Sequence, residues 1–214
     1  MSGVFITFEG GEGTGKSTQI AALARRLQSA GVVVRLLREP GGTAAGEAIR
    51  RILLDPDHDG LSARAELLLY EAARAQLVAE VIRPALEAGE VVICDRFFDS
   101  TTAYQGYARG LDLAEVRELH ATATGGLSPD RTIVLDIDPA AGLARATAHG
   151  ADRLEREDIE FHKRVREGFL AIAAAEPQRV RVIDASGTIE DVAARIAAAL
   201  RDVPAVRVAL GESS

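Results

Sequence analysis

Short runs of apolar residues alternate along the chain with longer segments whose apolar residues recur at helical spacing. Val4 to Phe8 is the first such run, and Ile20, Leu23 and Leu27 follow it at i, i+3 and i+7, the period of an amphipathic helix. The other apolar runs predict strands over residues 32–37, 91–94, 132–135 and 180–183. After a first helix that Gly31 ends, further helices are predicted over about 44–54, 62–88, 99–108, 112–124, 139–148, 157–174 and 188–201.

Strands that alternate with helices of this length predict βαβ units and a mostly parallel sheet. The strand segments show little alternation of polar and apolar residues, which is typical of strands buried on both faces. The sequence therefore predicts an α/β fold, a five-stranded mostly parallel sheet flanked by helices. No linker divides the chain, so we expect a single domain over residues 1–214. We also expect a lid over about 146–157, where the chain is polar, and a loosely held tail after about residue 202.

Composition narrows the possible partners. The 25 Lys and Arg against 32 Asp and Glu give a net charge of −7, which disfavours general binding to nucleic acid or an anionic membrane. Cys94 is the one cysteine, which excludes a disulfide framework and a cysteine zinc site and fits a reducing compartment. No apolar run approaches the roughly 18–20 residues of a membrane span, and no secretory signal is recognisable. We expect a cytoplasmic protein with no nucleic-acid or membrane partner.

The segment between the first strand and the first helix matches the pattern G-x-x-x-x-G-K-[ST]. Its glycines let backbone N–H groups converge on phosphate oxygens, and the helix N-terminus adds partial positive charge. Lys16 is expected to reach the β- and γ-phosphates, and the Ser17 hydroxyl to ligate Mg²⁺. A plain glycine-rich turn with an exposed lysine is the alternative. The residues expected to bind ATP here are Gly10, Gly11, Glu12, Gly13, Thr14, Gly15, Lys16, Ser17 and Thr18.

Two further features narrow the class of nucleotide enzyme. The chain contains no Asn, so it lacks the Asn-Lys-x-Asp motif with which many GTPases read guanine. The strand over 91–94 ends in Asp95-Arg96, where the carboxylate is placed for the Mg²⁺ side of the site. An arginine beside the reacting phosphates suits a second bound phosphate better than activation of water. This favours transfer to a phosphorylated acceptor, although a salt bridge at the strand end is an alternative reading of the pair.

Three segments together resemble the thymidylate kinase family. They are Phe8 to Thr18, the turn Arg38-Glu39-Pro40-Gly41-Gly42-Thr43, and Asp95 to Gly106 with its Asp-Arg-Phe and Ala-Tyr-Gln-Gly motifs. The resemblance covers about residues 3 to 200, with the motifs in order. It implies a P-loop nucleoside monophosphate kinase fold, phosphorylation of dTMP to dTDP with ATP and Mg²⁺ for dTTP synthesis, and a homodimer.

The resemblance also implies which residues bind dTMP. Tyr70 would stack on the thymine and Arg74, one helical turn later, would hydrogen-bond its carbonyl edge; spacing alone would equally fit a core tyrosine and a surface arginine. Tyr104 would pack where a ribose 2′-hydroxyl would sit. Glu12, an acid inside a phosphate loop, would face the sugar 3′-hydroxyl or Mg²⁺ through water. The implied dTMP ligands are Glu12, Arg38, Pro40, Arg50, Tyr70, Arg74, Arg96, Thr101, Thr102 and Tyr104, and the implied Mg²⁺ residues are Ser17 and Asp95.

The interior of the phosphate loop carries no arginine, yet charge that develops on the transferred phosphoryl group needs compensation. The resemblance is to the bacterial members that place basic residues in the lid, which here offers Arg145, Arg153 and Arg156 to ATP. Arg153 is the expected catalytic arginine. The residues expected to act in catalysis are therefore Lys16, Glu12, Arg96 and Arg153.

Two other functions stay open from the sequence. One is a P-loop kinase for another nucleotide or for a deoxynucleoside. The other is a non-catalytic ATP-binding regulator that uses the loop as a switch. Cys94 and the four histidines, which include His120 and His162, are expected to be structural or solvated.

Overall fold

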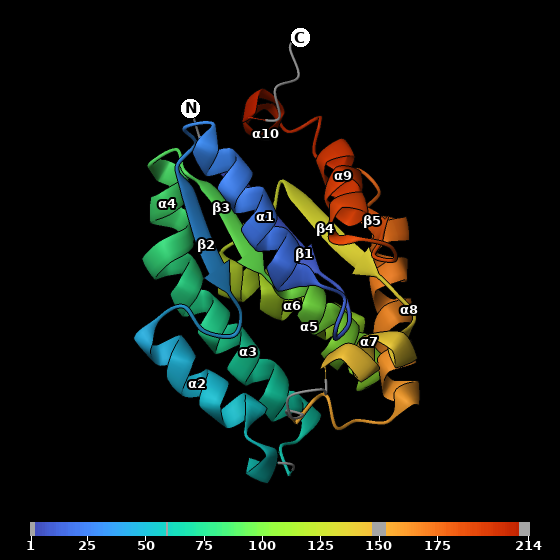
Figure 1. The fold of residues 1–214 in the computed structure, drawn as a ribbon. Coiled ribbons are helices and arrows are strands. Elements are labelled where there is room, and N and C mark those ends of the chain that lie inside the picture. Colours follow the sequence, from blue (N-terminus) through green and yellow to red (C-terminus); the bar gives the residue numbers. More distant parts are fainter. Residues whose placement is uncertain (1–2, 59, 147–152, 210–214) are drawn as a thin grey trace.

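The structure is a computed structural model that describes residues 3–58, 60–146 and 153–209. At its centre lies a sheet of five parallel strands in the order β2-β3-β1-β4-β5 (Figure 1). This confirms the predicted α/β class and the mostly parallel sheet. The strands are β1 (Val4–Glu9), β2 (Val34–Arg38), β3 (Val91–Asp95), β4 (Arg131–Asp136) and β5 (Val180–Asp184).

The helices follow the strands in the predicted alternation. Several begin at a side chain that accepts a hydrogen bond from the first turn, such as Thr43 before α2 and Ser62 before α3. The helices are α1 (Lys16–Ser29), α2 (Ala44–Leu54), η1 (Pro56–His58), α3 (Ala63–Leu77), η2 (Val78–Ile82), α4 (Arg83–Glu87), α5 (Phe98–Thr101), η3 (Thr102–Ala108), α6 (Leu113–Thr124), α7 (Pro139–Ala146), α8 (Ile159–Ala175), α9 (Ile189–Ala199) and α10 (Pro204–Ala209).

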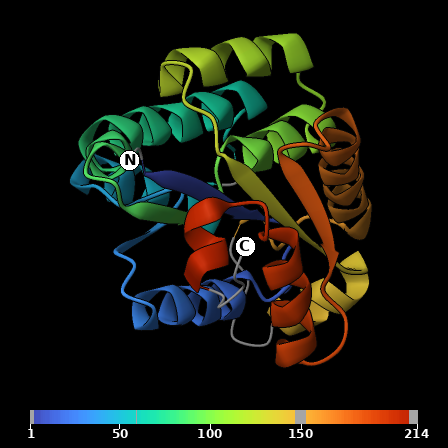
Figure 2. The same ribbon diagram turned by 90° about the horizontal axis from the view of Figure 1, so that it is seen from above.

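Helices cover both faces of the sheet. Figure 2 shows α1, α9 and α10 on one face and the helices α3, α4, α6 and α8 on the other. Neighbouring strand residues supply opposite faces: Ile6 packs in the core under α1 and α9, whereas Phe5 packs in the core under η2 and α4. Burial on both faces explains why the strand segments read as nearly continuous apolar runs.

Two predicted helices contain π-helical turns. The helix predicted over 62–88 is a continuous run of α3, η2 and α4. Pro84 lies in its last part and lacks the N–H that an α-helix would direct at the Glu80 carbonyl, which accounts for a local change of hydrogen bonding there. The second π-helix is η3, which follows α5 directly after β3. Such turns occur frequently at functional sites.

The register of the sheet brings functional residues together at its carboxyl edge. Asp95 at the end of β3 pairs with Phe8 of β1 on one side and with Arg38 of β2 on the other. The phosphate loop begins at Gly10, directly after β1 ends, and so starts at the same edge. Ligands of open parallel sheets bind outside this edge, so the sheet itself assembles the candidate site.

The C-terminal tail is more ordered than the sequence predicts. Val203 and Val206 are buried in the core with residues of α1 and α9, and α10 forms around them. The loosely held tail after residue 202 is therefore replaced by a docked helix up to Ala209. Residues 147–152 of the expected lid, with Gly150 and His149 among them, lie outside the described residues. Within the described ranges, every helix is too short or too polar to cross a membrane.

Candidate active site

The phosphate loop closes tightly on itself between β1 and α1. Gly13 has a φ of 62°, and a Cβ built there would lie 2.0 Å from the carbonyl oxygen of Gly142 in α7. Both the backbone conformation and the close approach therefore require glycine. The loop wraps the N-terminus of α1, so its N–H groups and the helix dipole together form a ready anion site.

Lys16 lies folded back on this loop. Its Nζ donates to the carbonyl oxygens of Gly10 at 3.1 Å and Gly11 at 2.9 Å, and the residue is buried. Burial and the neighbouring guanidinium of Arg96 lower the pKa of Lys16 to about 8, so it is predominantly charged at neutral pH. An incoming phosphate competes with neutral carbonyl groups, not with a carboxylate, for this ammonium.

Ser17 and Asp95 meet at the first turn of α1. The Ser17 hydroxyl donates to Asp95 Oδ2 at 3.3 Å, and Asp95 Oδ1 is buried without a hydrogen-bond partner in the described chain. A buried carboxylate oxygen with no donor is costly unless a cation or water completes it. Hydroxyl and carboxylate oxygens are the ligands that Mg²⁺ prefers, so this pair fits the predicted metal residues.

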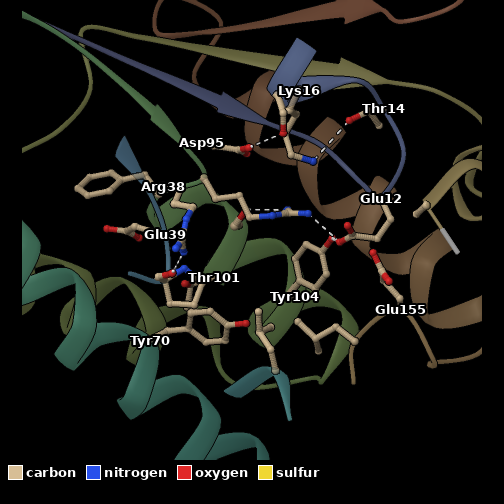
Figure 3. A pocket seen from close by; sticks show the side chains of 18 of the residues that line it. Glu12, Thr14, Lys16, Arg38, Glu39, Tyr70, Asp95, Thr101, Tyr104 and Glu155 are labelled. Carbon is tan, nitrogen blue, oxygen red and sulfur yellow. Dashed lines mark hydrogen bonds and ion pairs between the residues drawn. The ribbon is translucent and has the colours of Figure 1, made fainter. Parts of the chain in front are cut away.

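Arg96 joins the phosphate loop to the helix after β3. Its Nη2 lies 2.7 Å from Glu12 Oε1, and the Tyr104 hydroxyl donates to the same oxygen at 2.5 Å (Figure 3). Burial raises the pKa of Glu12, but Arg96 and Lys16 outweigh it, so that this pKa falls to about 2. Glu12 is therefore an anion held between cations and a phenol.

Glu9 accepts hydrogen bonds from the turn that follows Arg96. Arg96 has a φ of 71°, the one positive value for a non-glycine residue in the described ranges, and so carries backbone strain. The Glu9 carboxylate accepts from the Phe97 backbone N–H at 2.7 Å and from the Ser100 hydroxyl at 2.5 Å. Burial and the nearby Asp99 raise the pKa of Glu9 to about 8. We attribute the strained geometry of the turn to this anchor.

Two more arginines converge opposite the phosphate loop. Arg38 Nη1 and Arg50 Nη1 both donate to the carbonyl oxygen of Pro40, at 3.2 and 2.9 Å. Their guanidinium groups are thereby within reach of one common anion. Glu47 neutralises part of this charge, because its Oε1 lies 3.0 Å from Arg38 Nη2.

Arg74 is buried and lines the same cavity as Tyr70. Its Nε donates to Glu39 at 2.9 Å, its Nη1 to Glu71 at 2.6 Å and its Nη2 to Thr101 at 3.0 Å. Burial alone would lower the pKa of Arg74, but the two carboxylates raise it, so the guanidinium stays charged. A buried arginine fixed on three sides can present its remaining donors to a ligand in a defined direction.

One cavity of about 470 Å³ connects these groups. It runs from the phosphate loop, past Asp95 and Arg96, to Tyr70 and Arg74. The predicted residues that line it are Glu12, Gly13, Thr14, Gly15, Lys16, Ser17, Thr18, Arg38, Pro40, Arg50, Tyr70, Arg74, Asp95, Arg96, Thr101 and Tyr104. Gly10 and Gly11 line a separate, smaller cavity together with Leu135 and Ile137.

Thr102 does not line this cavity. Its hydroxyl lies 3.2 Å from the carbonyl oxygen of Phe98 and 2.9 Å from Nε2 of His120. Both contacts hold the Thr102 side chain toward Phe98 and toward His120 of α6. The structure therefore brings Thr101, but not Thr102, to the cavity.

The three lid arginines also lie away from this cavity in the structure. Arg153 is buried; its Nε donates to the carbonyl oxygen of Leu53 at 2.8 Å and its Nη2 pairs with Glu66. Arg153 and Arg156 line a second cavity of about 280 Å³, and Arg145 is exposed in the last turn of α7. The Arg153 side chain is thus held by Leu53 and the buried Glu66 carboxylate, and its contact with ATP stays a prediction.

Several residues of the site were not predicted. Glu39, Phe97, Ser100, Gln105, Leu154 and Glu155 line the main cavity, and Glu9 supports it from below. An acid at the end of an otherwise apolar strand was the available signal for Glu9, since a buried carboxylate needs dedicated partners. Cys94 is buried and burial raises the pKa of its thiol, which confirms a structural residue.

Comparison with known proteins identifies the family. The family model described as Thymidylate kinase matches residues 8–196. The thymidylate kinase of Synechococcus sp. (strain JA-2-3B'a(2-13)) is 58% identical over 193 residues, which cover 90% of this chain and 92% of the relative. That of Deinococcus radiodurans is 53% identical over 201 residues, covering 94% and 97%. A crystal structure of thymidylate kinase from Ehrlichia chaffeensis superposes with a TM-score of 0.78 at 37% identity, covering 94% of this chain and 99% of that one. With its sheet, its phosphate loop and its arginine-lined cavity, the chain belongs to the thymidylate kinase family.

Proposed function

We propose that this chain transfers the γ-phosphoryl group of ATP to the phosphate of dTMP, forming dTDP and ADP. The observation that carries the proposal is the single continuous cavity in which a phosphate loop faces Arg38, Arg50 and Arg96. ATP phosphates would occupy the loop, and the acceptor phosphate the arginines. Tyr70 and Arg74 complete the acceptor end with a ring for stacking and donors for a base carbonyl.

The arrangement supports transfer by positioning and charge stabilisation. An acceptor phosphate is already an anion, so its attack on the γ-phosphorus needs no strong general base. Lys16 and Arg96 supply positive charge on either side of the point of transfer, in a partly enclosed site where such charge is most effective. Glu12 orients Arg96 and Tyr104 through one carboxylate oxygen. Glu12 and Tyr104 would then face the deoxyribose of dTMP.

We propose that Ser17 and Asp95 hold the Mg²⁺ that accompanies ATP. The support is the orphaned Oδ1 of Asp95 beside the Ser17 hydroxyl. Bound there, the ion would neutralise charge on the phosphate oxygens. Among the described residues, no group of three or more His, Cys, Asp or Glu is arranged to hold a metal ion by itself.

We also propose a compartment, an assembly and a metabolic role for the protein. It would be a cytoplasmic homodimer that has no nucleic-acid or membrane partner and serves dTTP synthesis. Net charge of −7 and one buried cysteine support this setting, as does the similarity to thymidylate kinases. Sedimentation equilibrium tests the dimer, and a molar mass that fits one chain at micromolar concentration contradicts it.

A coupled assay of ADP release tests the function. It compares dTMP, dUMP, UMP, CMP, AMP, GMP and thymidine as acceptors under the same conditions with Mg²⁺ and ATP. The proposal expects the highest kcat/KM for dTMP. Preference for another nucleotide or for thymidine would support the rival kinase, and nucleotide binding without turnover of any acceptor would support the non-catalytic regulator.

A further inference from the structure

A chain of buried polar contacts runs from α6 to the acceptor end of the cavity. The Thr102 hydroxyl lies 2.9 Å from Nε2 of His120, and Nδ1 of the same ring lies 2.7 Å from Glu71 Oε1. Glu71 Oε1 also accepts from Arg74 Nη1 at 2.6 Å. Each of these side chains is at least nine-tenths buried, and Arg74 is 1% exposed. Of the four, Arg74 lines the cavity.

His120 is held in one orientation. Its ring stacks on Phe98, with the centroids 5.4 Å apart and the planes at 23°. Burial lowers the pKa of His120, so the ring carries one proton at neutral pH. The carboxylate at Nδ1 favours that proton on Nδ1, which leaves Nε2 unprotonated beside the Thr102 hydroxyl. His120 is thus a fixed donor to Glu71, on the side of the carboxylate away from the cavity.

Glu71 depends on this donor. Oε1 has two partners, His120 and Arg74, and Oε2 is buried with no hydrogen bond within the described chain. Without His120 the buried carboxylate would keep a single donor, Arg74. A buried carboxylate that lacks hydrogen-bond donors is unfavourable, so Glu71 would attract a donor that can rotate toward it. That donor is the guanidinium of Arg74, whose orientation matters at the cavity.

We propose that His120, acting through Glu71, is a positioning residue for Arg74 and so for recognition of the acceptor base. This inference rests on the proposed function, because it assumes that Arg74 contacts the base of the acceptor. His120 lines no part of the main cavity. Arg74 uses three of its five N–H donors on Glu39, Glu71 and Thr101, which leaves at most two for a ligand. A small rotation of the guanidinium therefore changes what the ligand meets.

Two amide substitutions at position 120 separate positioning from packing. The amide nitrogen of Asn can replace Nδ1 and donate to Glu71, whereas the amide of Gln reaches the place of Nε2 instead. Both substitutions lose the stack on Phe98, so this loss cancels in the comparison. His120→Gln is expected to raise the KM for dTMP about tenfold, the effect of one lost hydrogen bond to a charged group. His120→Asn is expected to restore a KM close to that of the parent.

The kcat and the KM for ATP are expected to stay near the parent values in both variants, since the phosphate loop is untouched. Glu118→Gln, an exposed change on the same helix, is the control. Equal dTMP KM values for the Asn and Gln variants, or losses of kcat that follow losses of Tm, overturn the proposal. If neither variant folds, Thr102→Val tests the next link, and an unchanged KM for dTMP there overturns it as well.

The result also separates this inference from the proposed function. A parent protein that does not phosphorylate dTMP refutes the proposed function. A parent that does so, with variants that match it in KM for dTMP, refutes the positioning role alone.

Discussion

Glu12 Oε1 lies 2.7 Å from Arg96 Nη2, so a residue inside the phosphate loop is bonded to the arginine at the end of β3. These residues are 84 positions apart, and both line the main cavity. Because the same carboxylate oxygen accepts from Tyr104, one atom links the loop, the strand end and η3. A partly buried ion pair therefore ties the phosphate loop to the end of β3.

This pair predicts a pH dependence of stability. The pKa of Glu12 is about 2 in the folded protein and 4.5 in the absence of the fold, so its anion stabilises the protein above about pH 4.5. That contribution, on the order of 3 kcal/mol, is lost as the pH falls from 4.5 through 2. Urea unfolding of the parent and of Glu12→Gln should give free energies that differ at pH 7 and converge toward pH 2.5. Glu118→Gln should follow the parent throughout; a constant gap for Glu12→Gln contradicts the assignment.

The two lysines of the chain form a matched test of the phosphate loop. Lys16→Ala should lower kcat by about 10³ or more, because the ammonium compensates charge on the transferred group. The Tm should stay near that of the parent, since glycines and not Lys16 set the loop conformation. Lys163, exposed and paired with Glu160 on α8, serves as the control, and Lys163→Ala should be indistinguishable from the parent. Activity of Lys16→Ala within a few fold of the parent would disprove the role.

Tyr104 combines a hydroxyl on Glu12 with a ring packed edge-on against Phe161 and Phe169. Tyr104→Ala should weaken the use of dTMP and reduce discrimination against ribothymidine monophosphate, because the ring no longer closes the space beside C2′. Tyr104→Phe should weaken dTMP use about tenfold but leave the discrimination intact, since the ring remains. The ratio of kcat/KM for the two acceptors measures this. An unchanged ratio in the Ala variant would reduce Tyr104 to a packing residue.

The sequence predicts a catalytic role for Arg153, whereas its contacts in the structure favour a structural one. As a lid arginine, its removal should lower the single-turnover rate by roughly 10². As the buried partner of Glu66, its removal should lower the free energy of unfolding by about 3–5 kcal/mol. Arg64→Ala, which removes an exposed ion pair with Glu115, should cost at most about 1 kcal/mol. Loss of stability with an intact transfer rate in Arg153→Ala would confine this arginine to a structural role, and the reverse would place it in the chemistry.

For the helical segment after β3, the local sequence pattern did not predict which side chains face the cavity. The sequence predicted a helical segment over 99–108 and placed Thr101, Thr102 and Tyr104 on it. Helix geometry sends neighbouring side chains apart, and the π-helical hydrogen bonds of η3 change their directions again. Thr101 consequently meets Arg74 while Thr102 meets His120. Which residue faced the ligand could not be read from spacing.

The chain's own order of apolar runs, glycines and charged motifs determined the α/β class, the phosphate loop and the residues at the strand ends. These follow from short-range physics: strand and helix periods, the need for glycine in the loop, and the shared carboxyl edge of parallel strands. Tertiary structure alone decided which distant groups meet. Glu66 pairs with Arg153 from 87 positions away, Glu9 accepts from the turn that follows Arg96, and α10 packs on the core through Val206. A buried ion takes whatever opposite charge the fold brings within reach, and that choice is not encoded in local sequence.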